Sequence, residues 1–333
     1  MNPQQYIISQ LEALKAPLAF DSRPKNNTEL INVILKHLFS KKFRKYSIPE
    51  KNQKIIRTAV EKSVLNNEPI KISFPFGGYK LWRFEETPEA DWAELFFIMY
   101  VARWLKQVCT LYPKGVIFTF WFDEIMIEKM NNIPESDLRA YEKSLNAVLT
   151  FVKPYLSPNM KFETFMERSR YESSEVFEKE LAVEIEKLRE VRAKDPQPLS
   201  EAAIRSIEMN VKLLPGQADD PLWRERIDLM HYAYYNLQEK NTRIRNGYTT
   251  ENITAFTVFF EPNVIPIGSA KTSIVRFWVG VGVLEQRKDS FIENILSITQ
   301  LEKAKFDWES VSIKGLEGKN FRKIRVIKPE KEL

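Results

Sequence analysis

The chain has 333 residues, of which 44% are hydrophobic and 12% aromatic, enough for one large or two ordinary packed domains. With only 10 glycines and 18 prolines, the composition excludes a low-complexity or fibrous protein. The 50 basic and 45 acidic residues leave a net charge of +5, a mild excess that suits an anionic small molecule as well as nucleic acid.

The scarcity of cysteine and histidine narrows the chemistry. Cys109 is the single cysteine, which excludes an internal disulfide, and its apolar, helically spaced neighbours predict a buried packing residue rather than a nucleophile. His37 and His231 lie outside any metal-ligand spacing, and no G-x-S-x-G motif accompanies them. Zinc hydrolases and triad hydrolases are therefore disfavoured, and we expect no metal ion.

The N-terminal sequence has no basic segment followed by an apolar one, so no secretory signal is predicted. The longest apolar run, 95–102, is followed by Arg103 and is too short to cross a membrane. We therefore expect a cytoplasmic protein with no membrane partner.

Two helices are predicted in the first 65 residues, from the helical spacing of apolar side chains over 30–38 and 55–65. Between them lies the basic run Lys41-Lys42-Phe43-Arg44-Lys45. Such a run is expected to be a solvated surface, with phosphate binding as the alternative.

Residues 69–74 alternate between apolar and polar side chains, as a short strand does. In the loop that follows, Gly77 and Gly78 allow backbone amides to approach a ligand closely, although paired glycines also occur in ordinary turns. Lys80 and Arg83 then supply positive charge that suits a phosphate or a carboxylate. The loop has neither a Walker sequence nor a G-x-G-x-x-G sequence.

A strongly apolar helix predicted over 92–111 leads through a Tyr-Pro-Lys-Gly turn into a strand predicted over 115–122. This strand ends at Asp123 and Glu124. Ligands bind beyond the carboxyl ends of the strands in parallel α/β sheets, so a carboxylate here is well placed for chemistry. The alternative is that Asp123 only caps the next helix. Its position alone does not decide between the two.

Further elements expected before residue 245 are helices over 134–148, 175–210 with a break at 195–198, and 223–240, and a short strand over 161–165. The alternation of strands and helices predicts a parallel sheet with crossover helices. After Gly247 strand-forming residues predominate, and we expect paired strands over 253–260 and 272–284 and a hairpin of 311–313 with 321–327. We therefore place a domain boundary near 245, between regions 1–245 and 246–333.

Residues 74–145, about a fifth of the chain, resemble the pyoverdine/dityrosine biosynthesis family, whose members include isocyanide (isonitrile) synthases. In that family a Phe-Pro loop leads to a Lys, a helix, a Tyr-x-x-Gly turn and a strand ending in Ser-Asp-Gly-Arg. A Pro-containing turn and an Ala-Tyr helix follow. The corresponding residues here are Phe74-Pro75, Lys80, Tyr112, Gly115, Asp123, Pro134 and Ala140-Tyr141.

The chain departs from the family pattern at two places. Phe122-Asp123-Glu124-Ile125 stands where the family has Ser-Asp-Gly-Arg, so the expected arginine is missing. The family also has an Arg-rich strand ending in His-Pro in its C-terminal part, and the nearest segment here, 271–278, contains no histidine.

The resemblance implies an α/β fold with a Rossmann-like parallel sheet, flanking helices and a smaller, strand-containing C-terminal region. It also implies an isonitrile synthase of secondary metabolism, a transferase-like enzyme with no metal or redox cofactor. Its substrates would be the α-amine of an amino acid and the ketone of ribulose 5-phosphate. Because imine formation needs proton transfers, we predict Asp123 as the general acid/base or as the anchor of the substrate ammonium, with Glu124 as a second carboxylate.

Four cations are candidates for binding the sugar phosphate. Lys80 and Arg83 are predicted first, with Lys271 and Arg276 as more distant candidates. Each is equally compatible with an ordinary solvated surface residue.

Two alternative functions stay open. A divergent family member that acts on or binds another amino acid or sugar phosphate is consistent with the missing Gly-Arg after Asp123. A non-enzymatic protein that binds an anionic ligand or nucleic acid through residues 41–45 is disfavoured, since the net charge is small and no recognition motif is present.

Overall fold

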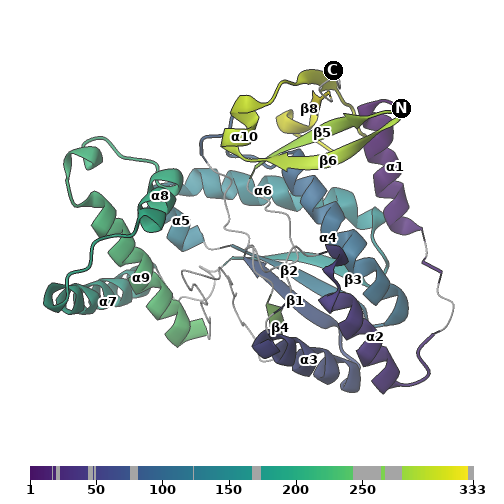
Figure 1. The fold of residues 1–333 in the computed structure, drawn as a ribbon, viewed down its shortest axis with the longest axis horizontal. Helices are drawn as coiled ribbons and strands as arrows, with labels where there is room; N and C mark the ends of the chain where they lie inside the picture. Colours follow the sequence, from purple (N-terminus) through teal and green to yellow (C-terminus); the bar gives the residue numbers. More distant parts are fainter. Residues whose placement is uncertain are drawn as a thin grey trace.

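A computed structural model describes residues 1–16, 18–19, 23–43, 48, 50–75, 82–122, 124–166, 174–242, 264–266 and 280–328. Its helices and strands form a parallel sheet with flanking helices, a three-helix unit and a separate C-terminal sheet (Figure 1). No helix within these residues is long and apolar enough to span a membrane.

The parallel sheet contains β1 (Ile70–Pro75), β2 (Val116–Phe122), β3 (Met160–Met166) and β4 (Val264–Pro266). The strands lie in the order β3-β2-β1-β4, and every neighbouring pair is parallel. Along the chain, β2 and β3 are added in turn on one side of β1, and β4 is then added on the other side of β1. The strands predicted over 69–74, 115–122 and 161–165 are thus confirmed as β1, β2 and β3.

Helices connect and cover these strands. The N-terminal helices are α1 (Pro3–Lys15), α2 (Asn27–Phe39) and α3 (Glu50–Leu65); the crossovers contain α4 (Trp92–Leu111), α5 (Glu124–Asn131) and α6 (Glu135–Val152). In Figure 1 the sheet lies between α6 on one side and α3 on the other. Short 3-10 turns occur at Lys41–Phe43, Lys153–Tyr155, Gln217–Asp219 and Lys319–Phe321.

The aromatic residues of β2 form the centre of the core. Phe118, Phe120 and Phe122 are fully buried, as expected for a strand that is covered on both faces. Phe97 of α4 packs its ring against Phe74 of β1 and Phe120 of β2, with centroids 5.1 and 6.1 Å away. α4 can remain regular over its whole length because its sequence contains no glycine or proline, and an Asp91–Glu94 capping box starts it.

The three-helix unit consists of α7 (Ser174–Lys194), α8 (Glu201–Asn210) and α9 (Trp223–Thr242). These helices were predicted, and the break expected at 195–198 extends over 195–200. It extends away from the sheet (Figure 1). Its apolar contacts with α5 join Ile125 and Met130 to Phe177, Leu181 and Tyr234. The helix that follows β2 therefore links the sheet to this unit.

The C-terminal sheet contains β5 (Val281–Arg287), β6 (Ser290–Leu296), β7 (Asp307–Ser310) and β8 (Lys323–Ile327), with α10 (Ile298–Lys303) after β6. Its order is β6-β5-β8-β7, and only the β5–β8 pair is parallel. Its apolar residues, among them Leu284, Phe291 and Ile324, belong to the same core as α1 and α4. An α/β fold with a parallel sheet, flanking helices and a further C-terminal sheet is therefore confirmed.

Two details of the C-terminal prediction differ from the structure. The strand that pairs with β8 covers Asp307–Ser310 rather than 311–313. The N–H of Val311 still donates to the carbonyl of Arg322, but Arg322 has helical backbone angles and caps the preceding 3-10 turn, so the extended pairing ends there. β6 was not predicted. The strand expected over 253–260, most of 272–284 and the boundary at 245 lie outside the described residues, so the division into two regions stays a prediction.

Candidate functional site

The carboxyl ends of the parallel strands define the candidate site. β1 ends at Pro75, β2 at Phe122, β3 at Met166 and β4 at Pro266. Because the strands are parallel, the chain leaves the sheet from the same edge each time. The direction of strand succession reverses between β1 and β4, and such a switch point is where open α/β sheets bind their ligands.

Four of the predicted site residues, Lys80, Asp123, Lys271 and Arg276, lie outside the described residues. Along the chain, Asp123 directly follows β2, and Lys80 comes five positions after the end of β1. Lys271 and Arg276 come five and ten positions after the end of β4. Their roles stay predictions, and each follows β1, β2 or β4 along the chain.

Glu124 is the first residue of α5, and only 2% of its surface is exposed. A carboxylate in the first turn of a helix is stabilised by the helix dipole. The predicted second carboxylate is therefore an interior group at the end of β2, rather than a solvated one.

Arg83 is exposed and spans from the β1 loop to the three-helix unit. Its Nη2 donates a hydrogen bond of 2.6 Å to the backbone carbonyl of Glu208 in α8, and its guanidinium lies 5.0 Å from the ring of Trp82. No hydrogen bond or ion pair joins Arg83 to Glu124 in the described part of the chain. The remaining guanidinium N–H groups leave Arg83 able to bind an anion as well.

A buried ion pair, which sequence reasoning missed, holds the segment that carries Arg83. Arg325 of β8 donates to Glu86, and the two residues are 4% and 7% exposed. Asn320 donates from Nδ2 to the backbone carbonyls of Glu86 and Ala90 at 2.8 and 3.2 Å. The C-terminal sheet thus fixes the chain between β1 and α4. No local pattern could have predicted a pair separated by 239 positions.

The N-terminus of α4 is closed. Asp91 accepts hydrogen bonds from the backbone of Ala93 at 2.7 Å and of Gly282 at 3.3 Å. Gly282 lies so close that a Cβ atom there would be 2.4 Å from the backbone of Trp92. In many nucleotide-binding sheets the helix after the first strand binds phosphate with these amides. Here they are covered, so a phosphate at this edge would depend on side-chain cations.

Three residues of the family-like pattern have structural roles. Tyr112 donates from its hydroxyl to the backbone carbonyls of Ser63 and Glu68 at 3.0 and 2.7 Å. Gly115 has a φ of 66°, and a Cβ there would overlap the carbonyl oxygen of Asn159.

Tyr141 is fully buried under α4 and donates to Glu94 at 3.2 Å; burial and the charge of Glu94 raise its pKa well above the usual value. Tyr112, Gly115 and Tyr141 therefore stabilise the fold around the site.

Cys109 and the histidines are accounted for by packing. Cys109 is buried, as predicted, and burial raises the pKa of its thiol to about 12. The ring Nε2 of His37 lies 2.6 Å from the carbonyl oxygen of Trp104, and burial lowers the pKa of His231. Within the described ranges, no group of three or more His, Cys, Asp and Glu side chains could hold a metal ion.

No family model matches this chain, and no curated protein matches its sequence. Among solved structures, the fold is similar to the crystal structure of the PvcA protein from Pseudomonas aeruginosa, with a TM-score of 0.57 and 15% sequence identity. The superposition covers 90% of this chain and 99% of that chain. The chain therefore shares, over nearly its whole length, the fold of PvcA.

Proposed function

We propose that this protein is an isocyanide synthase-like enzyme that condenses the α-amine of an amino acid with ribulose 5-phosphate in the biosynthesis of a secondary metabolite. The observation that carries the proposal is the arrangement of the parallel sheet, since every predicted site residue belongs to a segment that follows β1, β2 or β4. The resemblance of residues 74–145 and the fold similarity to PvcA support the same conclusion at the level of the family.

The proposed first step is imine formation. The amine nitrogen bonds to the ketone carbon, and after proton transfers the carbonyl oxygen leaves as water, so that C=N replaces C=O. A carboxylate directly after β2 would accept a proton from the amine and return one to the departing hydroxyl. Such a group contributes about 10²–10⁴-fold to the rate, and we assign this role to Asp123.

The sugar phosphate would be bound by cations at the switch point. Lys80 and Arg83 follow β1, and Lys271 and Arg276 follow β4, the two strands between which the direction reverses. Because Asp91 and Gly282 cover the N-terminus of α4, these side chains are the available source of positive charge in the proposal.

One observation favours a second candidate, a divergent enzyme of the same fold that acts on another amino acid or sugar phosphate. Ile125 stands where the family pattern has an arginine, and it is buried against the three-helix unit. Whatever the family arginine binds would have to be bound differently here.

The experiment is mass-spectrometric product detection after incubating the purified protein with ribulose 5-phosphate and a pool of amino acids. We expect an isocyanide, its loss in Asp123→Asn, and its retention in Asp195→Asn, a control at an exposed aspartate after α7. Stabilisation by one of these compounds without an isocyanide would favour the divergent enzyme. If the protein forms no isocyanide and none of these compounds stabilises it, both candidates are refuted.

A further inference from the structure

A cavity of about 240 Å³ lies between α1, α4 and β6. Most of its wall is apolar, with four aromatic rings from the two helices and two isoleucines from β6: Tyr6, Phe96, Phe97, Tyr100, Ile292 and Ile295. None of the six residues predicted for the strand-edge site lines it. The cavity is therefore a concave site that the proposed function does not use.

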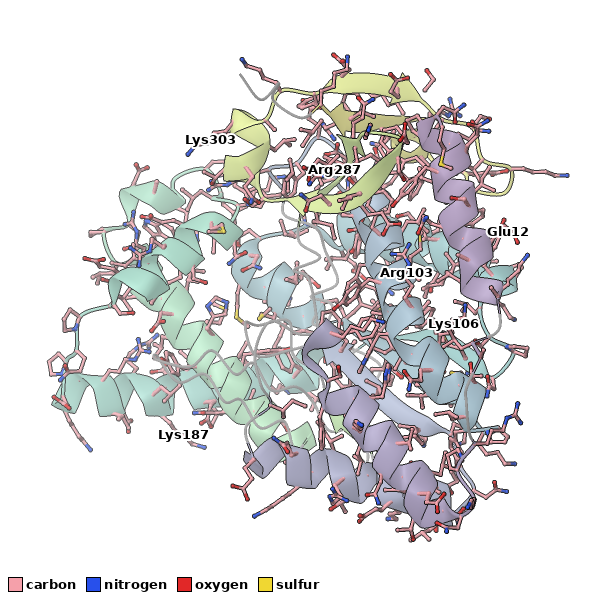
Figure 2. All side chains as sticks on the ribbon, turned by 45° about the vertical axis from the view of Figure 1, so that its right-hand side comes forward. Glu12, Arg103, Lys106, Lys187, Arg287 and Lys303 are labelled. Atoms are coloured by element: carbon pink, nitrogen blue, oxygen red, sulfur yellow. The ribbon has the colours of Figure 1, made fainter. Side chains whose placement is uncertain are left out.

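An ion pair forms the polar part of the wall. Arg103 donates from Nη1 and Nη2 to the two carboxylate oxygens of Glu293, each at 2.6 Å, and from Nη2 to Gln10 of α1 at 3.2 Å. Figure 2 shows Arg103 on α4 beside α1. Burial alone would lower the pKa of Arg103, but the hydrogen bonds and charge of Glu293 outweigh it and raise that pKa. The wall therefore carries one positive and one negative charge that balance.

The balanced pair selects against charged ligands. An anion that approached Arg103 would lie beside the carboxylate of Glu293, and a cation that approached Glu293 would lie beside the guanidinium. Arg103 has five N–H groups, and those at Nε and the second position of Nη1 have no partner among the described residues. A neutral ligand with an accepting oxygen could use them.

The size of the cavity suits a ligand with one ring. An apolar cavity of about 150 Å³ holds benzene, so about 240 Å³ leaves room for one ring and a small substituent. Aromatic walls favour an aromatic ring through edge-to-face contacts. We propose that this cavity binds neutral, single-ring aromatic compounds that carry a hydrogen-bond-accepting oxygen, such as aromatic alcohols.

The test is calorimetry on the full chain with four matched probes: benzyl alcohol, toluene, benzoate and benzylammonium. We expect benzyl alcohol to bind at one saturable site. It should bind about tenfold more tightly than toluene, because a hydrogen bond to a charged group adds to the contacts of the ring. Benzoate and benzylammonium should bind more weakly than benzyl alcohol. No saturable binding of benzyl alcohol, or equal binding of either charged probe, overturns the proposal.

A cavity-filling variant locates the site. Ile292 is 40% exposed, so Ile292→Trp can fill the cavity from its open side, whereas Val183→Trp places the same side chain on α7 at a position 55% exposed. We expect binding to weaken at least about tenfold in the first variant and to stay unchanged in the second. Unchanged binding in Ile292→Trp overturns the proposal.

Methyl NMR of the unmodified chain gives the same answer without a variant, because benzyl alcohol should shift the Ile292 and Ile295 signals. If those signals do not move on saturation, the proposal fails. Asp123→Asn should leave this binding unchanged, which separates the result from that of the proposed function.

Discussion

Removing Arg325 is expected to destabilise the protein more than removing any exposed ion pair. In Arg325→Met the carboxylate of Glu86, which is 7% exposed, loses the charge that compensates it, and breaking a buried pair in this way costs about 3–5 kcal/mol. The variant also removes the guanidinium that lies 4.3 Å from the ring of Trp308. For comparison, Arg205→Met breaks an exposed pair with Glu201 in α8 and should cost at most about 0.5 kcal/mol.

The double variant Glu86→Leu/Arg325→Met removes both charges, and so distinguishes the loss of the ion pair from the cost of leaving one buried charge unpaired. Arg325 Nε and Glu86 Oε2 are buried without hydrogen-bond partners in the described part of the chain, so the pair carries a desolvation cost that it does not fully offset. We therefore expect the double variant to recover most of the loss, and to come within about 1 kcal/mol of the native protein.

Urea unfolding followed by circular dichroism measures the free energy of unfolding of the four proteins, with hydrogen exchange of residues 84–91 as a local readout. The single variant Arg325→Met should exchange faster there, since the ion pair anchors that segment. If the free energy of unfolding of Arg325→Met lies within about 1 kcal/mol of the native value, the ion pair does not hold the segment. A double variant less stable than the single one would contradict the desolvation argument.

Further substitutions test the packing of individual residues. Gly282→Ala should cost about 2–4 kcal/mol of unfolding free energy, from overpacking against Trp92 and the lost bond to Asp91. Gly216→Ala, where a Cβ meets nothing closer than 3.8 Å, should cost only about 1–2 kcal/mol for its left-handed backbone, and equal losses would argue against a close approach. Tyr112→Phe should cost about 1–2 kcal/mol in the same assay, because the carbonyls of Ser63 and Glu68 lose their donor; a neutral effect would contradict this role. For Cys109, the folded pKa of about 12 lies above the ordinary value of 9.0, so its contribution to stability is present below pH 9 and is lost as the pH rises toward 12. Between pH 8 and 10 the native protein should therefore lose about 1.4 kcal/mol relative to Cys109→Ala, and an identical pH dependence of the two would refute the shift.

The parallel sheet could be predicted from the sequence because its signals are local. β2 is a run of apolar residues between a turn and a carboxylate, and the apolar helix before it has no helix breaker. The order β3-β2-β1-β4 depends on pairing between strands that are far apart in the sequence, so no local pattern predicts it.

The C-terminal sheet could be predicted only in part. All four residues of β7 are exposed, so they show no apolar alternation, and their strand conformation depends on pairing with β8. In β6 the apolar residues Phe291, Ile292 and Ile295 are spaced as they would be on a helix, although the chain is extended.

The candidate site divides in the same way. The end of β2 before Asp123 and Glu124 could be read from the sequence, because a buried strand that stops at a charged residue is a local event. The attachment of Arg83 to α8 spans 125 positions, and the closure of the α4 N-terminus by Gly282 spans 191. Such contacts depend on how whole elements pack, which local patterns do not specify.

One isotope experiment addresses the proposed chemistry itself. The protein is supplied with ribulose 5-phosphate carrying ¹³C at the ketone carbon, together with the amino acid selected from the pool, and the product is analysed by mass spectrometry. Because the amine nitrogen bonds to that carbon, the account predicts an isocyanide one mass unit heavier, with the label in the carbon attached to nitrogen. An isocyanide without the label, or no isocyanide from the native protein with any amino acid, would contradict it.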